Sequence, residues 1–509
     1  TSTQIPHIVR RVIGQALGIP WGNVRVIKPY IGGGFGNKQD VLYEPLNAFL
    51  TTQVGGRPVK LDVSREETFC NTRTRHSIEF DLAAGVDKDG RLLAKDMHSY
   101  SNQGAYASHG HAIAANGLTS WRLQYACPNI RGEAYTIYTN TPVGGAMRGY
   151  GIPQVCFAIE SFMDDVANEI HMDPLEFRRK NLIQGYYEDA YLKPIAANTN
   201  GIFECLEKGA EYIHWDEKRK EYAEQTGDVR KGVGMALFSY KTGVWPISLE
   251  IAGARLSLNQ DGSVQLMLGA TEIGQGADTV FSQMVAETLH TDMEHVHIKT
   301  VQDTDVSPFD TGAYASRQSF VTGTAVRHCA EILRDKILAY AKTLLPEIDT
   351  RELTLKDNWI WAGDEQAISL AALAEESYYS LTNSSVLTAE VSEQVKKNTI
   401  ATGCCFAEVE VDIKLGKIKI LHIINVHDSG KLLNPQLAEM QVHGGMSMGM
   451  GYGISEQLIL DEKTGKFLTN NLVDFKWRVF PDLPTFETHI EETPNDLSAF
   501  GGIGVGEIS

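Results

Sequence analysis

A glycine-rich loop is the feature that most constrains this chain. Residues 32–36 read GGGFG, so four glycines surround the single bulky side chain of Phe35. Without side chains, the backbone can approach a ligand closely and adopt positive φ. The apolar run 24–27 before the loop predicts a strand, which places the loop at the ligand-binding edge of an α/β sheet. Its spacing fits neither the dinucleotide-binding pattern nor the P-loop.

Two further polar residues are framed by glycines. Gln275 lies between two glycines and precedes a predicted helix over 279–289, which Asp278 can cap. Exposed N–H groups at such a helix start favour an anion such as a phosphate, although G-Q-G alone more often marks an ordinary tight turn into a helix. Near the other end of the sequence Glu507 follows a glycine, and a partly buried carboxylate there would have a raised pKa and could act as a base. Three glycine-framed sites spread over the whole length indicate one large bound cofactor.

Composition narrows the class of protein. The net charge of −18 over 509 residues, without a Lys/Arg-rich run, argues against a nucleic-acid partner. No apolar run is long enough to span a membrane. The seven cysteines include no C-x-x-C, so we expect neither zinc nor an iron–sulfur cluster in this chain. Their scatter predicts free thiols in a reducing, cytoplasmic compartment, and the adjacent pair Cys404–Cys405 reads as strand residues rather than a redox pair.

The hydrophobic pattern predicts an α+β, mixed α/β fold with antiparallel content. Residues 155–170 form an amphipathic helix, and Asp173-Pro174 starts a second one with basic residues near its end. The pattern also predicts strands, some of them paired as hairpins. These strands are 78–86, 94–100, 254–258, 264–268, 407–413 and 417–426.

A distant internal repeat suggests two related domains. A helix ending at Leu17 leads to the strand 24–27 and the glycine loop, and a helix ending at Leu289 leads to a strand over 296–298 and a polar loop. Such units predict two α/β domains that face a shared cofactor cleft, although the match is one of pattern more than identity. We expect the domains at 1–190 and 200–509.

The motifs together resemble the molybdenum-binding subunit of the xanthine dehydrogenase family, the molybdenum hydroxylases. The resemblance covers essentially the whole chain and is strongest to bacterial three-subunit xanthine dehydrogenases. It rests on six segments: IGGGFGNKQD (31–40), AMRGYGIPQ (146–154), MDPLEFRRKN (172–181), GATEIGQGADT (269–279), HDSGKLLNPQLAEMQVHGG (427–445) and GVGE (504–507).

The resemblance implies roles for residues at a molybdopterin cofactor whose dithiolene, rather than any protein side chain, holds the molybdenum. The implied cofactor-binding residues are Phe35, Gly36, Arg148, Gln275, Ala315, Ser316, Arg317 and Gln441. Of these, Phe35, Arg148 and Ala315 would lie near the metal without ligating it through their side chains. Glu507 matches the catalytic base.

The substrate side matches the family less well. Tyr150 matches a position that stacks an aromatic ring on the substrate, but Gln39 stands where well-known xanthine oxidisers carry Glu, and Asn116 where they carry Arg. The resemblance implies hydroxylation of an electron-poor C–H carbon of a purine, with water as the oxygen source. The neutral residues at 39 and 116 keep a nicotinate-like heterocycle or an aldehyde open as alternatives.

The resemblance also implies partners. Electrons would leave through an iron–sulfur subunit with 2Fe–2S clusters to an FAD subunit, in a dimer of heterotrimers, and the pterin is expected in its cytosine dinucleotide form. We expect the subunit to continue beyond both ends of this sequence. A nicotinamide dehydrogenase is disfavoured because the glycine loop lacks the required third glycine. An inactive assembly paralogue is disfavoured because Gln275 and Glu507 are both present.

Overall fold

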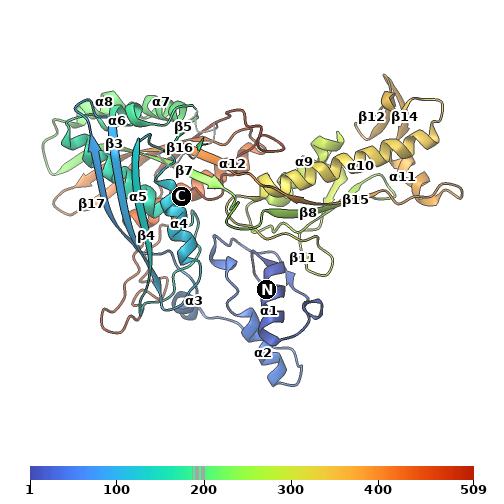
Figure 1. The fold of residues 1–509 in the computed structure, drawn as a ribbon, viewed down its shortest axis with the longest axis horizontal. Helices are drawn as coiled ribbons and strands as arrows, with labels where there is room; N and C mark the ends of the chain where they lie inside the picture. The colour runs from blue at the N-terminus through green and yellow to red at the C-terminus, as the bar shows by residue number, and fades with distance from the viewer. Residues whose placement is uncertain (186, 190–193, 196–200, 509) are drawn as a thin grey trace.

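The computed structural model describes residues 1–185, 187–189, 194–195 and 201–508, and it is a mixed α+β fold (Figure 1). The helices are α1 (Pro6–Leu17), α2 (Glu44–Gln53), α3 (Arg65–Asn71), α4 (Gly110–Ser120), α5 (Ile152–Glu169), α6 (Pro174–Asn181), α7 (Gly201–Ile213), α8 (Trp215–Tyr222), α9 (Ala277–Leu289), α10 (Gly323–Leu344), α11 (Leu370–Tyr379) and α12 (Pro435–Ile454). Within this described part of the chain, no helix is long and apolar enough to cross a membrane.

The strands form six sheets. They are β1 (Ile27–Lys28), β2 (Ile78–Val86), β3 (Leu92–Gly104), β4 (Asn129–Tyr138), β5 (Tyr187–Glu188), β6 (Pro194–Ile195), β7 (Val229–Thr242), β8 (Ile251–Leu258), β9 (Val264–Leu268), β10 (Val296–Ile298), β11 (Gln302–Asp303), β12 (Leu353–Lys356), β13 (Trp359–Ala362), β14 (Glu365–Ser369), β15 (Thr388–Gln394), β16 (Thr399–Asp412), β17 (Lys417–Asp428) and β18 (Thr485–Glu491). Their orders are β2-β3-β4, β18-β17-β16-β7, β10-β9-β8-β15, β12-β13-β14, β1-β11 and β5-β6.

The larger lobe, residues 78–242 and 399–491, lies on the left of Figure 1. It contains the sheets β2-β3-β4 and β18-β17-β16-β7, with α5 to α8 packed against them. Side chains from both stretches of sequence share one buried core, for example Met97, Phe177, Leu237 and Phe406. The larger lobe therefore cannot form its core from the first stretch alone.

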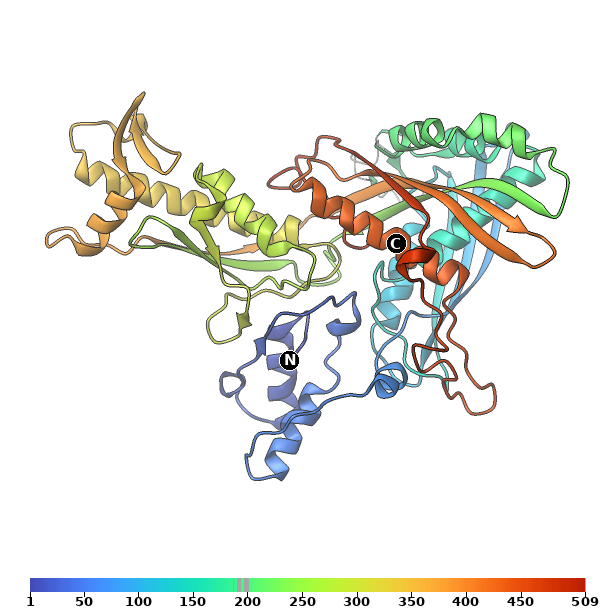
Figure 2. The ribbon, with the colours of Figure 1, turned by 180° about the vertical axis from the view of Figure 1, so that it is seen from behind.

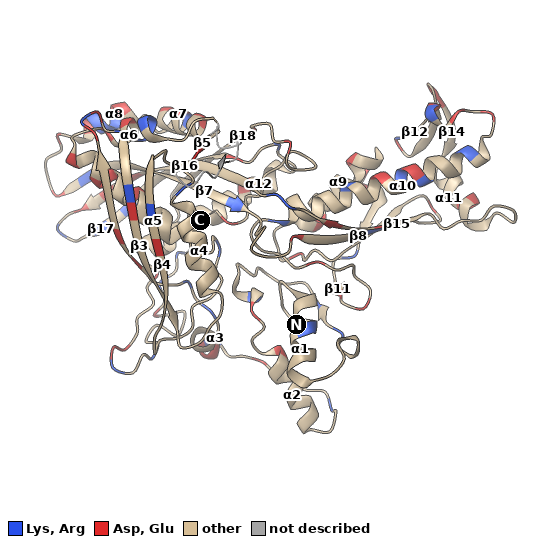
Figure 3. Ribbon diagram, in the orientation of Figure 1, with Lys and Arg blue, Asp and Glu red and all other residues tan. Residues whose placement is uncertain are grey.

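The smaller lobe, residues 251–394, lies on the right of Figure 1. Helices α9 and α10 cover one face of the sheet β10-β9-β8-β15, and the sheet β12-β13-β14 packs at the far end of α10. Buried apolar residues of β8, β9, α9 and α10, such as Leu256, Leu266, Phe281 and Leu333, form its core. Along α8 and α10 acidic and basic side chains are mixed (Figure 3).

Two chain crossings join the lobes. β7 pairs with β16 in the larger lobe, and β8, which follows β7, pairs with β15, which precedes β16, in the smaller lobe. Between these ladders the backbone N–H of Val395 donates to the carbonyl of Glu250 at 2.9 Å. The Asn398 side chain donates to the carbonyl of Trp245 at 2.7 Å. The lobes are thus connected by two antiparallel segments that are hydrogen-bonded to each other.

The N-terminal segment, residues 1–71, lies beside both lobes (Figures 1 and 2). It joins the smaller lobe through β1, which pairs with β11. The predicted strand over 24–27 is wrong in its bounds, because the ladder covers only Ile27 and Lys28. Val24 and Val26 are instead buried against Ile5 and Val9 of the α1 region.

Most other predicted elements are confirmed. The helix expected over 155–170 is α5, and Asp173 caps α6 by accepting from the N–H groups of Leu175 and Glu176. The pairs β8–β9 and β16–β17 are antiparallel hairpins as predicted. All seven cysteines are free, and the adjacent pair lies in β16. The predicted domain boundary between 190 and 200 falls largely outside the described residues and stays a prediction.

A buried charge cluster holds α5 to α6 in the larger lobe. The Arg178 side chain is fully buried and donates to Glu160 at 2.9 Å and to Asp164 at 2.6 Å. Glu160 also accepts from the Tyr125 hydroxyl at 2.8 Å and from the backbone of Leu237 at 2.9 Å. Breaking a buried pair leaves an uncompensated charge, whereas an exposed pair contributes little.

We therefore expect Arg178→Met to lower the free energy of unfolding by about 3–5 kcal/mol, because Glu160 loses its partner inside the core. The matched control is Arg179→Met on the same helix, whose half-exposed pairs with Glu176 and Glu207 predict a loss of about 0–1 kcal/mol. Urea unfolding followed by circular dichroism measures both variants. Equal losses of unfolding free energy in the two variants would show that burial does not set the contribution of the Arg178–Glu160 pair.

Candidate active site

A cavity of about 440 Å³ lies where the N-terminal segment, the smaller lobe and the C-terminal residues meet. Its lining comes mainly from five stretches of chain: 32–36, 273–280, 313–319, 429–441 and 502–507. This volume is typical of small-molecule and cofactor sites. The structure thus brings together the three glycine-framed sites that lie far apart in the sequence.

The glycine loop forms one wall of the cavity. Gly36 has φ of +101°, and a Cβ there would lie 2.9 Å from the backbone of Ala146, so the close approach requires glycine. The N–H of Gly36 donates to the side chain of Gln4 at 3.0 Å. Phe35 is half-exposed and has φ of +52°, a backbone conformation that bulky residues rarely adopt.

A second strained loop faces the first. Ala315 and Ser316 both have φ of +50°, and the carbonyl of Ala315 accepts from the N–H of Gly243 at 2.8 Å. Among the described residues, Ser316 Oγ is one of the buried oxygens without a hydrogen-bond partner. Non-glycine residues in this conformation cost about 1–3 kcal/mol each and cluster at functional sites.

Arg317 has a structural role that the sequence did not indicate. Its side chain is fully buried and donates to Glu250 at 2.5 Å, to Asp310 at 2.7 Å and to the carbonyls of Gly312 and Ile251 at 3.0 and 2.8 Å. These bonds use most of the guanidinium donors, so few are left for a ligand. Arg317 lines the cavity, but its charge serves to hold the loop 310–317 in place.

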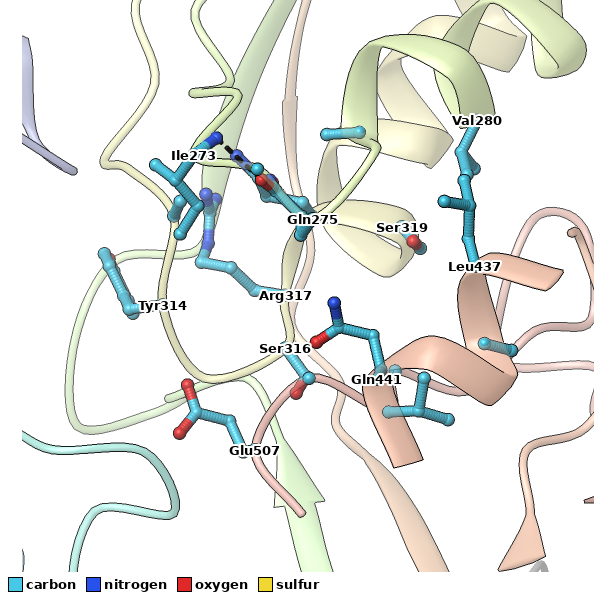
Figure 4. A pocket seen from close by; sticks show the side chains of 18 of the residues that line it. Ile273, Gln275, Val280, Tyr314, Ser316, Arg317, Ser319, Leu437, Gln441 and Glu507 are labelled. Carbon is cyan, nitrogen blue, oxygen red and sulfur yellow. Dashed lines mark hydrogen bonds between the residues drawn. The ribbon is translucent and has the colours of Figure 1, made fainter. Parts of the chain in front are cut away.

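Gln275 lines the cavity, with its amide hydrogen-bonded inside the protein. Its oxygen accepts from the N–H of Ile273 at 2.7 Å, and its nitrogen donates to Thr271 at 3.0 Å and to Gln318 at 2.6 Å. Figure 4 shows Gln275 and Ile273 in this arrangement at the edge of the open space.

At the start of α9 the glycine-framed segment is a turn whose N–H groups are bonded within the protein, the alternative that the G-Q-G pattern alone favours. The carboxylate of Glu272 accepts from the N–H groups of Gly274 at 2.6 Å, Gly276 at 3.3 Å and Asp278 at 3.0 Å. A protein carboxylate therefore already occupies the positive end of the helix. Asp278 lies in the first turn rather than at the cap, because the helix begins at Ala277.

Glu507 lies at one end of the cavity. Its carboxylate accepts from the N–H of Gly149 at 2.6 Å, close to the buried Arg148. Burial raises the pKa of Glu507 above the ordinary carboxyl value, although the Gly149 bond and the charges of Arg148 and Arg75 act to lower it. The direction is the one predicted from the sequence, and it suits a base near neutral pH.

Arg148 connects the C-terminal residues to α12. Its side chain donates to the carbonyl of Gly506 at 2.8 Å and to that of Gln441 at 2.8 Å. A Cβ on Gly444 would lie 3.2 Å from this guanidinium, which explains the small residue there. Figure 4 shows the Gln441 amide pointing from α12 toward the loop that carries Ser316.

The three predicted substrate residues lie beside the cavity rather than in its lining. Gln39 belongs to a short turn over Asn37–Gln39. The Asn116 side chain donates to the backbone carbonyl of Tyr150 at 3.0 Å, so it holds that residue. The Tyr150 hydroxyl lies 2.7 Å from His109 Nδ1, and φ of Tyr150 is +49°.

Sequence reasoning missed several residues of this region. Gln4 lines the cavity and bonds both walls, since it donates to the carbonyl of Ala313 at 2.5 Å and accepts from Gly36. No motif identifies it, because its position just before a Pro-initiated helix is common. Asp40 and His109 were also missed, since their contact joins positions far apart in the sequence.

Side chains that could form a metal centre are not gathered here. Across the described ranges of the chain, no group of three or more His, Cys, Asp or Glu residues is arranged to hold a metal ion. The cavity lining instead carries the carboxylate of Glu507, the basic side chains of Arg148, Arg317 and Lys431, and several amides and hydroxyls. This donor set suits a large polar organic cofactor.

Comparisons with known proteins agree with this arrangement. Two family models, both described as a molybdopterin cofactor-binding domain, match residues 1–182 and 208–484. A xanthine dehydrogenase molybdenum-binding subunit from Escherichia coli O157:H7 is 48% identical over 512 residues, which is all of this chain and 68% of the relative. An aldehyde oxidoreductase molybdenum-binding subunit, PaoC of Escherichia coli (strain K12), is 28% identical over 514 residues, again all of this chain and 66% of the relative.

Among solved structures, quinoline 2-oxidoreductase from Pseudomonas putida 86 superposes with a TM-score of 0.91 at 24% identity, covering all of this chain and 66% of that one. At this identity the likeness concerns the fold. The chain spans about two thirds of the length of these relatives.

The contact between the C-terminal residues and the strained loop yields a test. A Cβ on Gly504 would lie 2.3 Å from the backbone oxygen of Ser316, whereas a Cβ on Gly506 would lie 3.2 Å from its side-chain oxygen. We expect Gly504→Ala to lower the free energy of unfolding by about 1–3 kcal/mol, because backbone must shift. Gly506→Ala should cost clearly less in the same urea titration, and the reverse order would contradict the packing described here.

Proposed function

This chain belongs to the xanthine dehydrogenase family of molybdenum hydroxylases, and we therefore propose that it hydroxylates an electron-poor C–H carbon of a purine of the hypoxanthine or xanthine type. Glu507 is the observation that carries the proposal, since its carboxylate has a raised pKa and lies at one end of a cavity of cofactor size. The similarity to a xanthine dehydrogenase subunit at 48% identity supports the purine as substrate.

The residues around the cavity fit a molybdopterin. Ser316 Oγ is buried, without a protein partner among the described residues, and is therefore available to a polar ligand. Gln441 offers an amide, Gln275 has an acceptor site left on its amide oxygen, and Gly36 leaves room for close approach of the backbone. We propose that these residues, with the backbone of Phe35, Arg148 and Ala315 and the neighbourhood of Arg317, hold the cofactor. The bound cofactor supplies two-electron redox chemistry and the oxygen transfer to carbon.

Glu507 acts as the proton acceptor of the reaction in this proposal. The N–H of Gly149 orients the carboxylate, while the charges of the buried Arg148 and the partly exposed Arg75 stabilise its ionised form against the cost of burial. Tyr150 lies next to Gly149 and presents an aromatic ring that can pack on a flat substrate. Positioning and proton transfer are thus the contributions of the chain itself.

The partner chains and the compartment are part of the proposal. We expect electrons to leave through an iron–sulfur subunit with 2Fe–2S clusters to an FAD subunit, in a dimer of heterotrimers, with the pterin in its cytosine dinucleotide form. The relatives are named molybdenum-binding subunits, which supports an assembly of several chains. Free thiols at all seven cysteines agree with a cytoplasmic enzyme.

An aldehyde or another N-heterocycle is the second candidate substrate. The neutral amides of Gln39 and Asn116 carry no charge for purine recognition, and Asn116 is already hydrogen-bonded to the carbonyl of Tyr150. A relative at 28% identity is named an aldehyde oxidoreductase subunit. A dye-linked assay of the complete complex with hypoxanthine, xanthine, nicotinate and benzaldehyde separates these substrates, and absence of molybdenum and pterin would favour a non-enzymatic paralogue.

Glu507→Gln tests the base directly. The substitution keeps the shape of the side chain but cannot accept the proton, so we expect kcat to fall by about 10²–10⁴-fold while molybdenum and pterin content stay at the wild-type level. The matched control is Glu439→Gln, which removes an exposed carboxyl of α12. Metal analysis and dye-linked turnover are measured on the same preparations, and retained turnover of the Glu507 variant would refute the assignment.

The pH dependence of kcat/KM gives a second test. Only ionised Glu507 accepts a proton, so activity is lost as the pH falls through its pKa. Because burial raises this pKa, the acid limb should lie above the value of about 4.3 for an ordinary Glu. A pH profile in which kcat/KM persists unchanged to pH 4 would contradict a raised pKa for the Glu507 carboxyl.

A further inference from the structure

Three side chains from distant parts of the sequence form a hydrogen-bonded chain beside the cavity. Asp40 follows the glycine loop, His109 precedes α4 and Tyr150 precedes α5. The Asp40 carboxylate lies 2.9 Å from His109 Nε2, and His109 Nδ1 lies 2.7 Å from the Tyr150 hydroxyl. The rings of His109 and Tyr150 meet edge to face, with centroids 5.6 Å apart.

The first member of this chain is an ionised acceptor. Burial alone would raise the pKa of Asp40, but hydrogen bonds from His109 and Ser108 and the charge of Arg73 outweigh it and hold the pKa at about 2. An ionised carboxylate only accepts hydrogen bonds. The His109 tautomer that places its proton on Nε2, facing Asp40, leaves Nδ1 as an acceptor for the Tyr150 hydroxyl.

The last member is fixed at its backbone as well as at its hydroxyl. The N–H of Tyr150 donates to the carbonyl of Met147 at 2.8 Å, and its carbonyl accepts from Asn116 at 3.0 Å. Its positive φ is a conformation that persists only when the surroundings hold it. The Asn116 bond supplies part of that restraint, so the ring direction is well defined.

Tyr150 is also close to the proposed base. Its neighbour Gly149 donates to Glu507, and burial, followed by the charges of Asp40 and Glu507, raises the pKa of the Tyr150 hydroxyl. The phenol therefore stays protonated at all working pH values. Because it stays protonated, the direction in which its single proton points decides what the hydroxyl offers to a neighbouring ligand.

We propose that Asp40 and His109 are positioning residues that direct the Tyr150 proton toward the imidazole, so that the Tyr150 oxygen is left as a hydrogen-bond acceptor for a substrate bound next to Glu507. The site then selects substrates that carry an N–H donor over those that do not. This inference rests on the proposed function. It explains how a substrate region with the neutral residues Gln39 and Asn116 can select N–H heterocycles without a charged side chain.

Asp40→Asn is the sharpest variant, because its amide has a defined orientation. The N–H of Arg73 and the hydroxyl of Ser108 both donate to Oδ2, at 2.7 and 2.6 Å, so the amide oxygen should stay there. The amide nitrogen then faces His109 Nε2 and donates to it. His109 consequently carries its proton on Nδ1, donates to the Tyr150 oxygen, and turns the phenol proton toward the substrate.

The test compares hypoxanthine with its N-methylated analogues, in kcat/KM and in equilibrium binding to the complete complex. We expect Asp40→Asn and Tyr150→Phe each to lower the preference for N–H over N-methyl ligands by about three- to tenfold, as for one hydrogen bond. Benzaldehyde, which carries no N–H donor, serves as the comparison substrate, and its turnover should fall less than that of the N–H ligands. In the Tyr150→Phe background Asp40→Asn should have no further effect, because its action passes through the phenol.

His109→Asn and the exposed neighbour His111→Asn form a matched pair. His109→Asn should lower the preference for N–H over N-methyl ligands, and His111→Asn should not. This pair of variants replaces Asp40→Asn in the test if that variant accumulates poorly. Equal losses for N–H ligands, N-methyl ligands and benzaldehyde would overturn the proposal and leave a merely structural role. If the wild type oxidises none of these compounds, the proposed function fails, and the binding ratios still decide the role of Asp40 and His109.

Discussion

The buried guanidinium of Arg317 fixes the strained loop that forms one wall of the site. It bonds Glu250, where the chain crosses between the lobes, and Asp310, where the polar loop begins. Glu250 in turn accepts from the N–H of Val244. Breaking such a fully buried pair leaves a charge without a partner, which typically costs several kcal/mol. The strained conformation of Ala315 and Ser316 depends on this anchor, and so does the shape of the cavity.

Backbone strain is concentrated at a few positions around the cavity. Phe35, Tyr150, Ala315 and Ser316 all have positive φ, and all lie at or beside the cavity. Two of them are held by bonds from outside their own segment: Gly243 donates to the carbonyl of Ala315, and Asn116 donates to the carbonyl of Tyr150. Tertiary hydrogen bonds therefore restrain the backbone conformation around the cavity. This is expected where a large cofactor and a flat substrate must be placed against one carboxylate.

Much of the fold and of the candidate site was predictable from the sequence, and the exceptions have physical reasons. Local periodicity predicts α5 and the hairpin β16–β17, because their signals lie within a few residues. Glycine framing predicts Glu507 and its raised pKa. By contrast, the bond from Arg317 to Glu250 joins positions far apart in the sequence, which no local pattern encodes. The bonds of Glu272 at the start of α9 are local, but they do not follow a recognised capping pattern. The short β1 shows the same limit, since its length is set by its partner β11.

The order in which the strands are synthesised has a consequence for biogenesis. β7 completes its ladder only with β16, which leaves the ribosome roughly 160 residues later, so at about 5–20 residues per second the larger lobe waits on the order of 8–30 seconds for its missing strands. During this interval the smaller lobe can fold as an uninterrupted stretch with its own core. An unpaired edge exposed for so long is a template for aggregation, and nascent chains of this topology should therefore depend on chaperones that bind exposed strands.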